Sequence, residues 1–191
     1  MAESDDPDSA LDVASELQRF HDNCLPFGFD YEEGNHWAEG FVAHVGDDFA
    51  IFSRLQQRSW LNGFRAIRFD AIHKVGASGD AEFISRAMKA RKEEIPPNIP
   101  FRPISMVKFL SVVCDHFPIA VMDDAKENGN SSGVAGTIQR VQNGIVHLKM
   151  ISLDGYWCDN IHTIPVEDIE EVLFGSNYEN TLKLIGELPL N

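Results

Sequence analysis

The sequence predicts a mainly β protein of the α+β class, built as two tandem copies of a helix followed by a small, strongly bent five-stranded barrel. Two observations lead to this prediction. The same order of helical, strand-like and turn segments occurs twice along the 191 residues. Each copy also contains several short runs of alternating apolar and polar residues separated by turn residues, which is typical of strands. Each copy is expected to end in a short helix.

The C-terminal copy has the clearer pattern. Residues 104–114 carry apolar side chains at the spacing of one helical face, and Ser105 is a suitable N-cap. Asn143-Gly144 separates two alternating runs, and this dipeptide is a strong hairpin signal because both turn residues accept a positive φ. Residues 169–174 are the expected last strand. A short helix that is capped by Asn177 and ended by Gly186 is expected to follow it.

The N-terminal copy follows the same order. A helix is expected over Ala10–Phe20, strand-like runs follow it, and a second helix is expected from about Ala81 to Lys92. Gly40 and Gly136 open the second strand of their respective copies. The turn positions and the aliphatic residues agree in order between the two copies, which favours an internal duplication.

These patterns divide the chain into four segments. Residues 1–8 are an acidic tail that we expect to be disordered, and residues 9–94 are the first helix-and-barrel module. Residues 95–103 are a linker, and residues 104–191 are the second module. The linker has four prolines in nine residues, and such a composition favours an extended and fairly stiff spacer.

Charge and hydropathy narrow the classes of function. The formal net charge of −14 repels nucleic acids and anionic membranes at long range. No apolar run approaches the roughly 20 residues needed to cross a bilayer, and Met1–Asp8 lacks the basic and apolar regions of a signal peptide. We therefore expect a cytoplasmic protein that does not bind membranes.

A basic segment nevertheless lies inside this acidic chain. Residues 54–108 hold 11 Lys or Arg and 5 Asp or Glu, a net charge of +6. Two interpretations stay open for this segment. It can be a binding face, or it can be the complement of acidic residues elsewhere in the protein.

Aromatic residues accompany the basic ones around Trp60. Trp and Arg are the commonest hot-spot residues of protein interfaces, and a basic, aromatic surface also suits stacking on single-stranded nucleic acid. Packing in the core or between the modules is the third interpretation. The partner-binding residues that we predict are Arg58, Trp60, Phe64, Arg65, Arg68 and, in the second copy, Trp157.

Motifs for catalysis, metal binding or nucleotide binding are not recognisable. The three cysteines are an odd count without a close pair, which argues against a disulfide framework and a zinc knuckle. His21 with Cys24, and Cys114 with His116, form Cys-His couples, but a nucleophilic thiolate needs an electropositive, accessible setting. We interpret these helix ends as packing positions. We therefore expect no metal, no cofactor and no enzymatic activity.

The order of elements resembles the Sm-like small β-barrels, and it is also similar to bacterial proteins of unknown function that carry such barrels in tandem. The resemblance rests on the glycine that opens the second strand of each copy and on the Ile-x-x-Val runs of the last strands, at Ile72–Val75 and Ile169–Val172. It covers the fold pattern of most of both copies. It implies a five-stranded bent barrel for each.

The resemblance also implies RNA binding, in rings, through two loops. The family uses a polar pair after the second strand and a glycine beside a basic residue near the last turn. The corresponding stretches are residues 56–58 and 61–65 in the first copy, and 152–155 and 166–168 in the second. The second copy has acidic residues where RNA-binding members have basic ones, which argues against RNA binding by this copy and against rings.

The leading functional hypothesis is a non-catalytic protein of the adaptor, inhibitor or immunity type. It would bind a protein partner, expected to be basic, through an acidic and aromatic surface, because strong negative charge steers association. One alternative is single-stranded RNA binding through the basic and aromatic residues 54–68. Another is an enzyme with an unrecognised site between the modules. The sequence leaves open whether the protein is a monomer or a homodimer.

Overall fold

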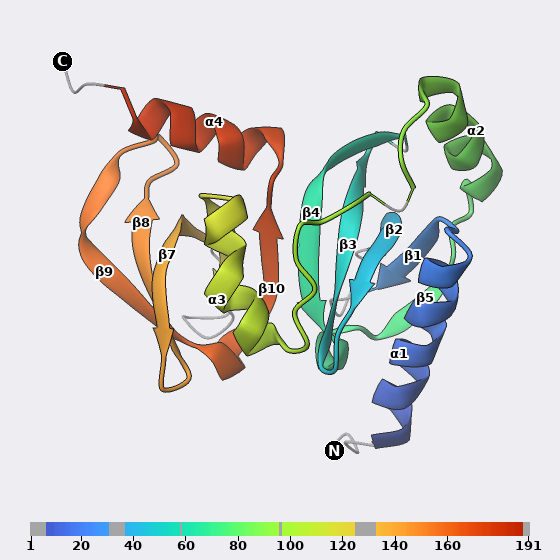
Figure 1. Cartoon of the computed structure of the whole chain (residues 1–191), viewed down its shortest axis with the longest axis horizontal. Helices are drawn as coiled ribbons and strands as arrows, with labels where there is room; N and C mark the ends of the chain where they lie inside the picture. Colours follow the sequence, from blue (N-terminus) through green and yellow to red (C-terminus); the bar gives the residue numbers. More distant parts are fainter. Residues whose placement is uncertain (1–6, 31–36, 58, 96, 125–132, 189–191) are drawn as a thin grey trace. The chain divides into compact units, whose positions relative to one another are not determined.

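The computed structural model describes residues 7–30, 37–57, 59–95, 97–124 and 133–188 (Figure 1). Over these residues the chain forms ten β-strands, four α-helices and two short 3-10 helices. None of the helices in these ranges is long and apolar enough to cross a membrane. Residues 1–6 of the predicted acidic tail lie outside the described residues, whereas Pro7 and Asp8 begin the first helix.

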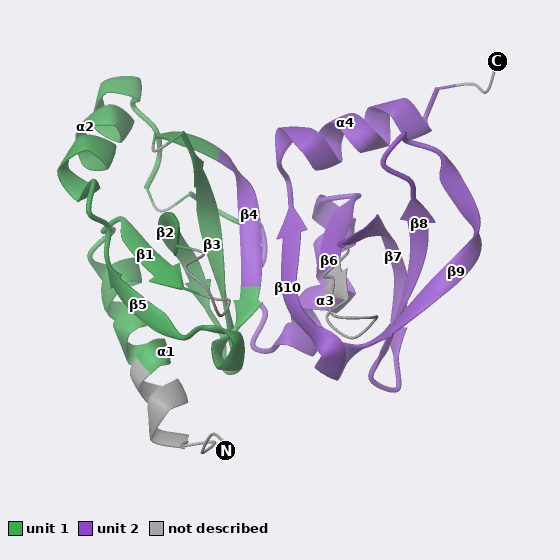
Figure 2. Ribbon diagram, turned by 180° about the vertical axis from the view of Figure 1, so that it is seen from behind, with its two compact units in different colours: residues 1–61, 67–99 green, residues 62–66, 100–191 purple. Residues whose placement is uncertain are grey.

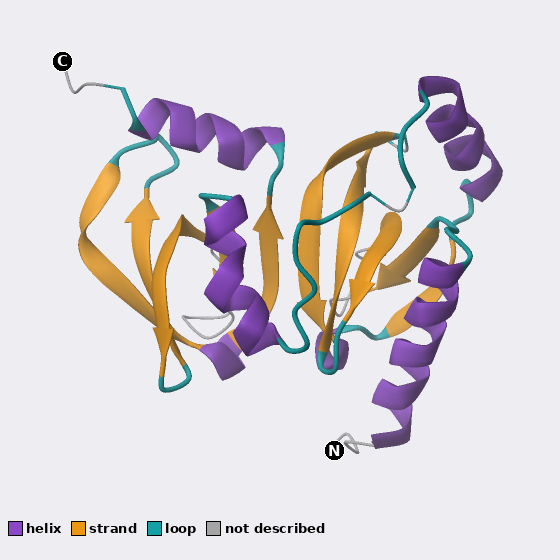
Figure 3. Cartoon of the chain, viewed as in Figure 1, coloured by secondary structure: helices purple, strands orange, loops and turns teal. Residues whose placement is uncertain are grey.

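The elements follow one order twice along the chain; Figure 3 colours the helices purple and the strands orange. The first series is α1 (Pro7–Asp22), β1 (Phe27–Asp30), β2 (Trp37–Val45), β3 (Phe49–Gln56), β4 (Trp60–Arg68), η1 (Phe69–Ala71), β5 (Lys74–Ala77) and α2 (Ala81–Arg91). The second series is α3 (Met106–His116), β6 (Ala120–Asp124), β7 (Val134–Gln142), β8 (Ile145–Ile151), β9 (Trp157–Pro165), η2 (Val166–Asp168), β10 (Ile169–Phe174) and α4 (Asn177–Gly186).

The strands form one open antiparallel sheet and not two closed barrels. Its order is β5-β1-β2-β3-β4-β10-β6-β7-β8-β9. The prediction of two tandem five-stranded Sm-like barrels, each with its own short C-terminal helix, is therefore wrong. A strand edge with unpaired N–H and C=O groups accepts any strand that matches it. On the side away from β3, strand β4 pairs with β10. It therefore does not close a barrel with the other strands of the first series.

The chain divides into two compact units, which Figure 2 distinguishes by colour. Unit 1 consists of residues 1–61 and 67–99, and unit 2 consists of residues 62–66 and 100–191. The middle residues of strand β4 therefore belong to unit 2, and its two ends belong to unit 1.

The core of unit 1 is rich in phenylalanine. Leu17 and Phe20, on the apolar face of α1, are buried against Phe27 of β1 and Phe52 of β3, and the rings of Phe27 and Phe52 lie 4.9 Å apart. The helix predicted over Ala10–Phe20 is confirmed. The sheet and α1 thus bury one continuous apolar layer, since each element carries its apolar residues on one face.

Helix α2 covers a second apolar cluster of unit 1. Ile84 and Met88, four residues apart on one face of the helix, are fully buried with Phe41 of β2. The predicted second helix is confirmed. Because Ile84 and Met88 face the sheet, the opposite face of α2 is exposed.

Unit 2 contains three local features that the sequence predicts. The side chain of Ser105 accepts a hydrogen bond from the backbone N–H of Lys108 and caps α3. Asn143 and Gly144 have φ values of 54° and 73° in the turn between β7 and β8. Helix α4 is present, but its N-cap is Ser176, in a capping box with Glu179, and not the predicted Asn177. The N-cap of α3, the hairpin and the existence of the last helix are confirmed.

Strands β7 and β8 approach each other closely at Gly136. A Cβ atom at Gly136 would collide with the backbone oxygen of Lys149 on β8, whereas one at Gly79 would meet nothing within 4 Å. Overpacking costs about 1–3 kcal/mol, so Gly136→Ala is expected to lower the free energy of unfolding by that amount. Gly79→Ala is expected to raise it by up to about 1 kcal/mol, because alanine restricts the unfolded chain. Urea unfolding of both variants is the measurement, and equal stabilities would contradict the predicted close approach.

Candidate functional site

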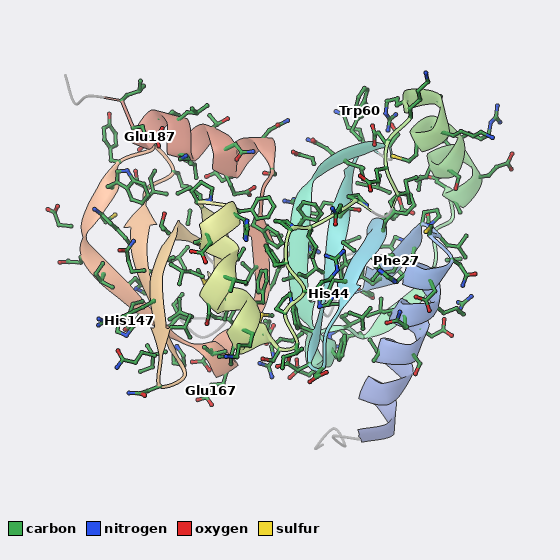
Figure 4. All side chains as sticks on the ribbon, in the orientation of Figure 1. Phe27, His44, Trp60, His147, Glu167 and Glu187 are labelled. Atoms are coloured by element: carbon green, nitrogen blue, oxygen red, sulfur yellow. The ribbon has the colours of Figure 1, made fainter. Side chains whose placement is uncertain are left out.

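Trp60, the first residue of β4, is the most exposed of the predicted partner-binding residues that the structure describes. Its side chain is 54% exposed, and Figure 4 labels it. The guanidinium carbon of Arg91 lies over the indole, 4.4 Å from the ring centroid. Such a cation–π contact is favourable, and it covers one face of the ring. More than half of the Trp60 side chain nevertheless remains exposed.

Arg91 is itself held in place from several sides. It is the last residue of α2, its Nη2 donates a hydrogen bond to the backbone oxygen of Ser59, and its Nε lies 2.6 Å from Oε1 of Glu93. Its Nη2 also lies 3.5 Å from the sulfur of Met88, which is buried. A guanidinium with this many contacts is fixed, so the indole that it covers is supported by a rigid neighbour.

The outer face of α2 adds basic and aromatic groups. Phe83, Arg86 and Lys89 are exposed on the helix, and Lys92 is exposed at its C-cap. Residues 81–92 hold four Lys or Arg and one Glu. We call this set the Trp60–α2 surface; it consists of Trp60, Phe83, Arg86, Lys89, Arg91 and Lys92. Arg91 is the member that contacts Trp60, and Arg86 and Lys89 lie about 140–160° around the helix from Arg91.

Phe64 and Arg65, two other predicted binding residues, are part of the packing of unit 2. The ring of Phe64 is stacked on Phe174 of β10 with centroids 5.4 Å apart. Arg65 is 8% exposed, and its Nε lies 2.5 Å from Oε1 of Glu171. These contacts direct both side chains into the fold.

The remaining predicted residues have separate surroundings. Arg68 pairs with Asp70, with Nε and Oδ1 3.3 Å apart. Trp157 is half-buried and donates a hydrogen bond from Nε1 to the backbone oxygen of Gly186, 3.1 Å away. Arg58 lies outside the described residues. Trp60 and Arg68 belong to unit 1, whereas Phe64, Arg65 and Trp157 belong to unit 2.

The α2 residues of this surface are not among the predicted partner-binding residues. Arg86, Lys89 and Arg91 lie in the basic segment 54–108, but the binding residues predicted within that segment end at Arg68. The signal was present, because four basic residues occur within the predicted helix 81–92. An amphipathic helix with a basic outer face is a feature that helical spacing can reveal.

Cys114, in α3, has a thiol that is disfavoured as a thiolate. Burial raises the pKa of Cys114 to about 11, and the neighbouring Asp115 charge acts in the same direction. The sulfur of Cys114 accepts a hydrogen bond from the backbone N–H of Ile138, 3.3 Å away. Within the described ranges no group of three or more His, Cys, Asp or Glu is arranged to hold a metal ion.

Comparison with known proteins gives no family for this chain. No protein-family model matches it, and no curated protein matches it. Function is therefore inferred from the contacts, exposure and charge of the described side chains.

The Arg65–Glu171 pair is expected to be a major contribution to the stability of unit 2. Arg65→Met would leave the Glu171 carboxylate without its cation in a buried position, and removing one partner of a buried pair costs about 3–5 kcal/mol. Arg68→Met removes one partner of the more exposed pair with Asp70, for which about 0–1 kcal/mol is expected. Chemical denaturation of both variants is the measurement. A similarly small loss of unfolding free energy in both variants would show that the Arg65–Glu171 pair is not a buried structural contact.

The thiols are expected to differ in reactivity. The thiolate is the reactive species, and burial disfavours it at Cys114, so iodoacetamide at pH 8 should leave Cys114 unmodified in the folded protein while exposed Cys24 is alkylated. Peptide mass spectrometry over a time course gives the two rates. In denaturant both cysteines should react at similar rates. Fast alkylation of Cys114 in the native protein would contradict its burial.

Proposed function

We propose that the protein acts by binding a protein partner, and that Trp60 is the main anchor of this contact. The observation that carries the proposal is the exposed indole held under the fixed guanidinium of Arg91. Trp and Arg dominate the binding energy of protein interfaces. A side chain that is already ordered loses little conformational entropy on binding, so this pair suits an interface anchor.

The charge of the Trp60–α2 surface indicates the chemistry of the partner. Four of the five charged residues in 81–92 are basic, but Arg91 is paired with Glu93, and Arg86 lies 3.9 Å from Glu82. Lys89 and Lys92 carry the remaining basic charge, which favours an acidic segment on the partner and not the basic partner expected from the net charge. Charges on exposed groups are largely screened beyond about 8 Å at physiological ionic strength. Local charges at the contact therefore outweigh the net charge of the whole chain.

RNA is the alternative ligand for a basic and aromatic surface. Two observations favour protein over RNA. Arg65 and Arg68, from the stretch considered for RNA, are paired with Glu171 and Asp70. One face of the Trp60 indole, which a base would use for stacking, is covered by Arg91. The compartment that we propose for this binding is the cytoplasm, where an exposed thiol such as Cys24 stays reduced.

Capture of partners by the immobilised full chain from a lysate of the source cells tests the proposal. Quantitative mass spectrometry should identify at least one protein that is recovered with the wild type and is reduced roughly 30-fold with Trp60→Ala, which corresponds to a hot-spot loss of about 2 kcal/mol. The double variant R86E/K89E, on the outer face of α2, should weaken recovery by a smaller factor than Trp60→Ala. The purified partner should then bind with the same ranking of variants.

Two control variants test whether the loss of the partner is specific to the Trp60–α2 surface. Trp37→Ala removes another exposed tryptophan of unit 1, and Lys108→Glu reverses an exposed charge on α3; both should recover the partner as the wild type does. Recovery should be unaffected by ribonuclease and should fall as salt rises. An identical set of proteins with Trp60→Ala would refute the proposed anchor, and loss of recovery on ribonuclease treatment would favour RNA.

A further inference from the structure

An exposed aliphatic patch lies at the C-terminal end of α4 in unit 2. Leu153 is 75% exposed, Leu184 and Leu188 are each 64% exposed, and Tyr156 and Ile185 are also exposed. We call these five residues the α4 patch. Isolated exposed apolar residues are ordinary, but a group of them on one surface marks an interaction site. None of the five belongs to the Trp60–α2 surface.

Direct contacts join the two segments that form the patch. Gly155, in the turn between β8 and β9, lies against the side chain of Ile185, where a Cβ atom would collide. Trp157 donates its hydrogen bond to the backbone oxygen of Gly186. Figure 1 shows the same arrangement, with α4 running past the ends of β8 and β9. The turn and the helix end therefore present one continuous surface.

The turn that carries Leu153 and Tyr156 is ordered by its own hydrogen bonds. The backbone N–H of Ser152 donates to the oxygen of Tyr156 at 2.8 Å, and the N–H of Gly155 donates to the oxygen of Ser152 at 2.9 Å. The hydroxyl of Ser152 accepts from the N–H of Tyr156 at 3.1 Å. The two apolar side chains are thus held on a fixed turn.

Core packing does not require the outer leucines of α4. Leu182 is the buried residue that joins α4 to Ile119 and Ile151. Leu184 lies about 200° around the helix from Leu182, so it faces away from that core. Leu188 follows the helix, which ends at Gly186, and its backbone N–H donates to the oxygen of Ile185 at 3.0 Å. These two leucines are therefore available to a partner.

Lys183 and Glu187, the charged residues beside the leucines, would complement the same two residues on a second, antiparallel copy of α4. Lys183 and Glu187 are both partly exposed, and Nζ and Oε1 lie 3.5 Å apart within one chain. In an antiparallel pair of α4 helices related by a two-fold axis level with Ile185, Lys183 of each copy would lie opposite Glu187 of the other. A two-fold interface uses the same patch on both copies and needs this self-complementarity.

We propose that the α4 patch is the surface through which two copies of this chain associate, with their α4 helices antiparallel. An anionic membrane is a poorer occupant, because Asp154 and Glu187 outnumber Lys183 at the patch and such membranes attract basic segments. Five side chains are fewer than the 20–30 residues per partner of a standard interface, so the dimer is weak, with a Kd on the order of 10–100 µM.

Sedimentation of the full chain over about 5–500 µM tests this proposal, since that range brackets the expected Kd. The wild type should pass from monomer to dimer. The double variant L184D/L188D should stay monomeric throughout, because each copy carries both changes. The matched variant Val107→Asp, at an exposed apolar position of α3, should dimerise as the wild type does. Circular dichroism and urea unfolding confirm that each variant is folded.

A charge swap provides a second test that does not depend on the leucine variants. Lys183→Glu and Glu187→Lys, each alone, should weaken the dimer at least tenfold, because like charges then face each other twice. The double swap K183E/E187K should restore the wild-type Kd. A wild type that stays monomeric at the highest concentration, a dimer unaffected by L184D/L188D, or a monomer that instead sediments with phosphatidylserine vesicles through these leucines would each overturn the proposal.

Discussion

Strand β4 sets the constraint on which both units depend. It is one strand of nine residues, but its middle residues 62–66 belong to unit 2 and its ends belong to unit 1. An extended backbone needs partners for its N–H and C=O groups, and the neighbours of β4 in the sheet are β3 and β10. The side chains follow the same division. Phe64 and Arg65 are held by Phe174 and Glu171 in unit 2, whereas Trp60 is held by Arg91 in unit 1.

The local elements could be predicted from the sequence because each depends on residues close together in the chain. Ser105 caps α3, the Asn143-Gly144 turn joins β7 to β8, and Leu17 and Phe20 mark the buried face of α1. The neighbour of β4 could not be predicted in this way. The alternating pattern of a strand shows which side chains are buried, but it does not show which other strand completes its hydrogen bonds. The two-barrel prediction was wrong at this point.

The candidate site was predictable only in part, for a related reason. Trp60 could be selected because an aromatic residue among arginines suits an interface, but its support by Arg91 depends on how α2 packs. Arg65 was selected on the same evidence, yet its carboxylate partner Glu171 lies far along the chain. The sequence left two interpretations of the basic segment open. The pairs of Arg65, Arg68 and Arg91 with carboxylates show that part of its charge is neutralised within the fold.

Net charge is a poor guide to both proposed contacts, and the physical reason is the same for each. A chain of net charge −14 repels an acidic partner and repels a second copy of itself. Either contact must therefore draw its favourable free energy from groups within a few ångströms of the interface, where screening is weak. At the Trp60–α2 surface these groups are an aromatic ring covered by Arg91 and the exposed Lys89 and Lys92. At the α4 patch they are leucines, whose burial is favourable whatever the charge of the rest of the protein.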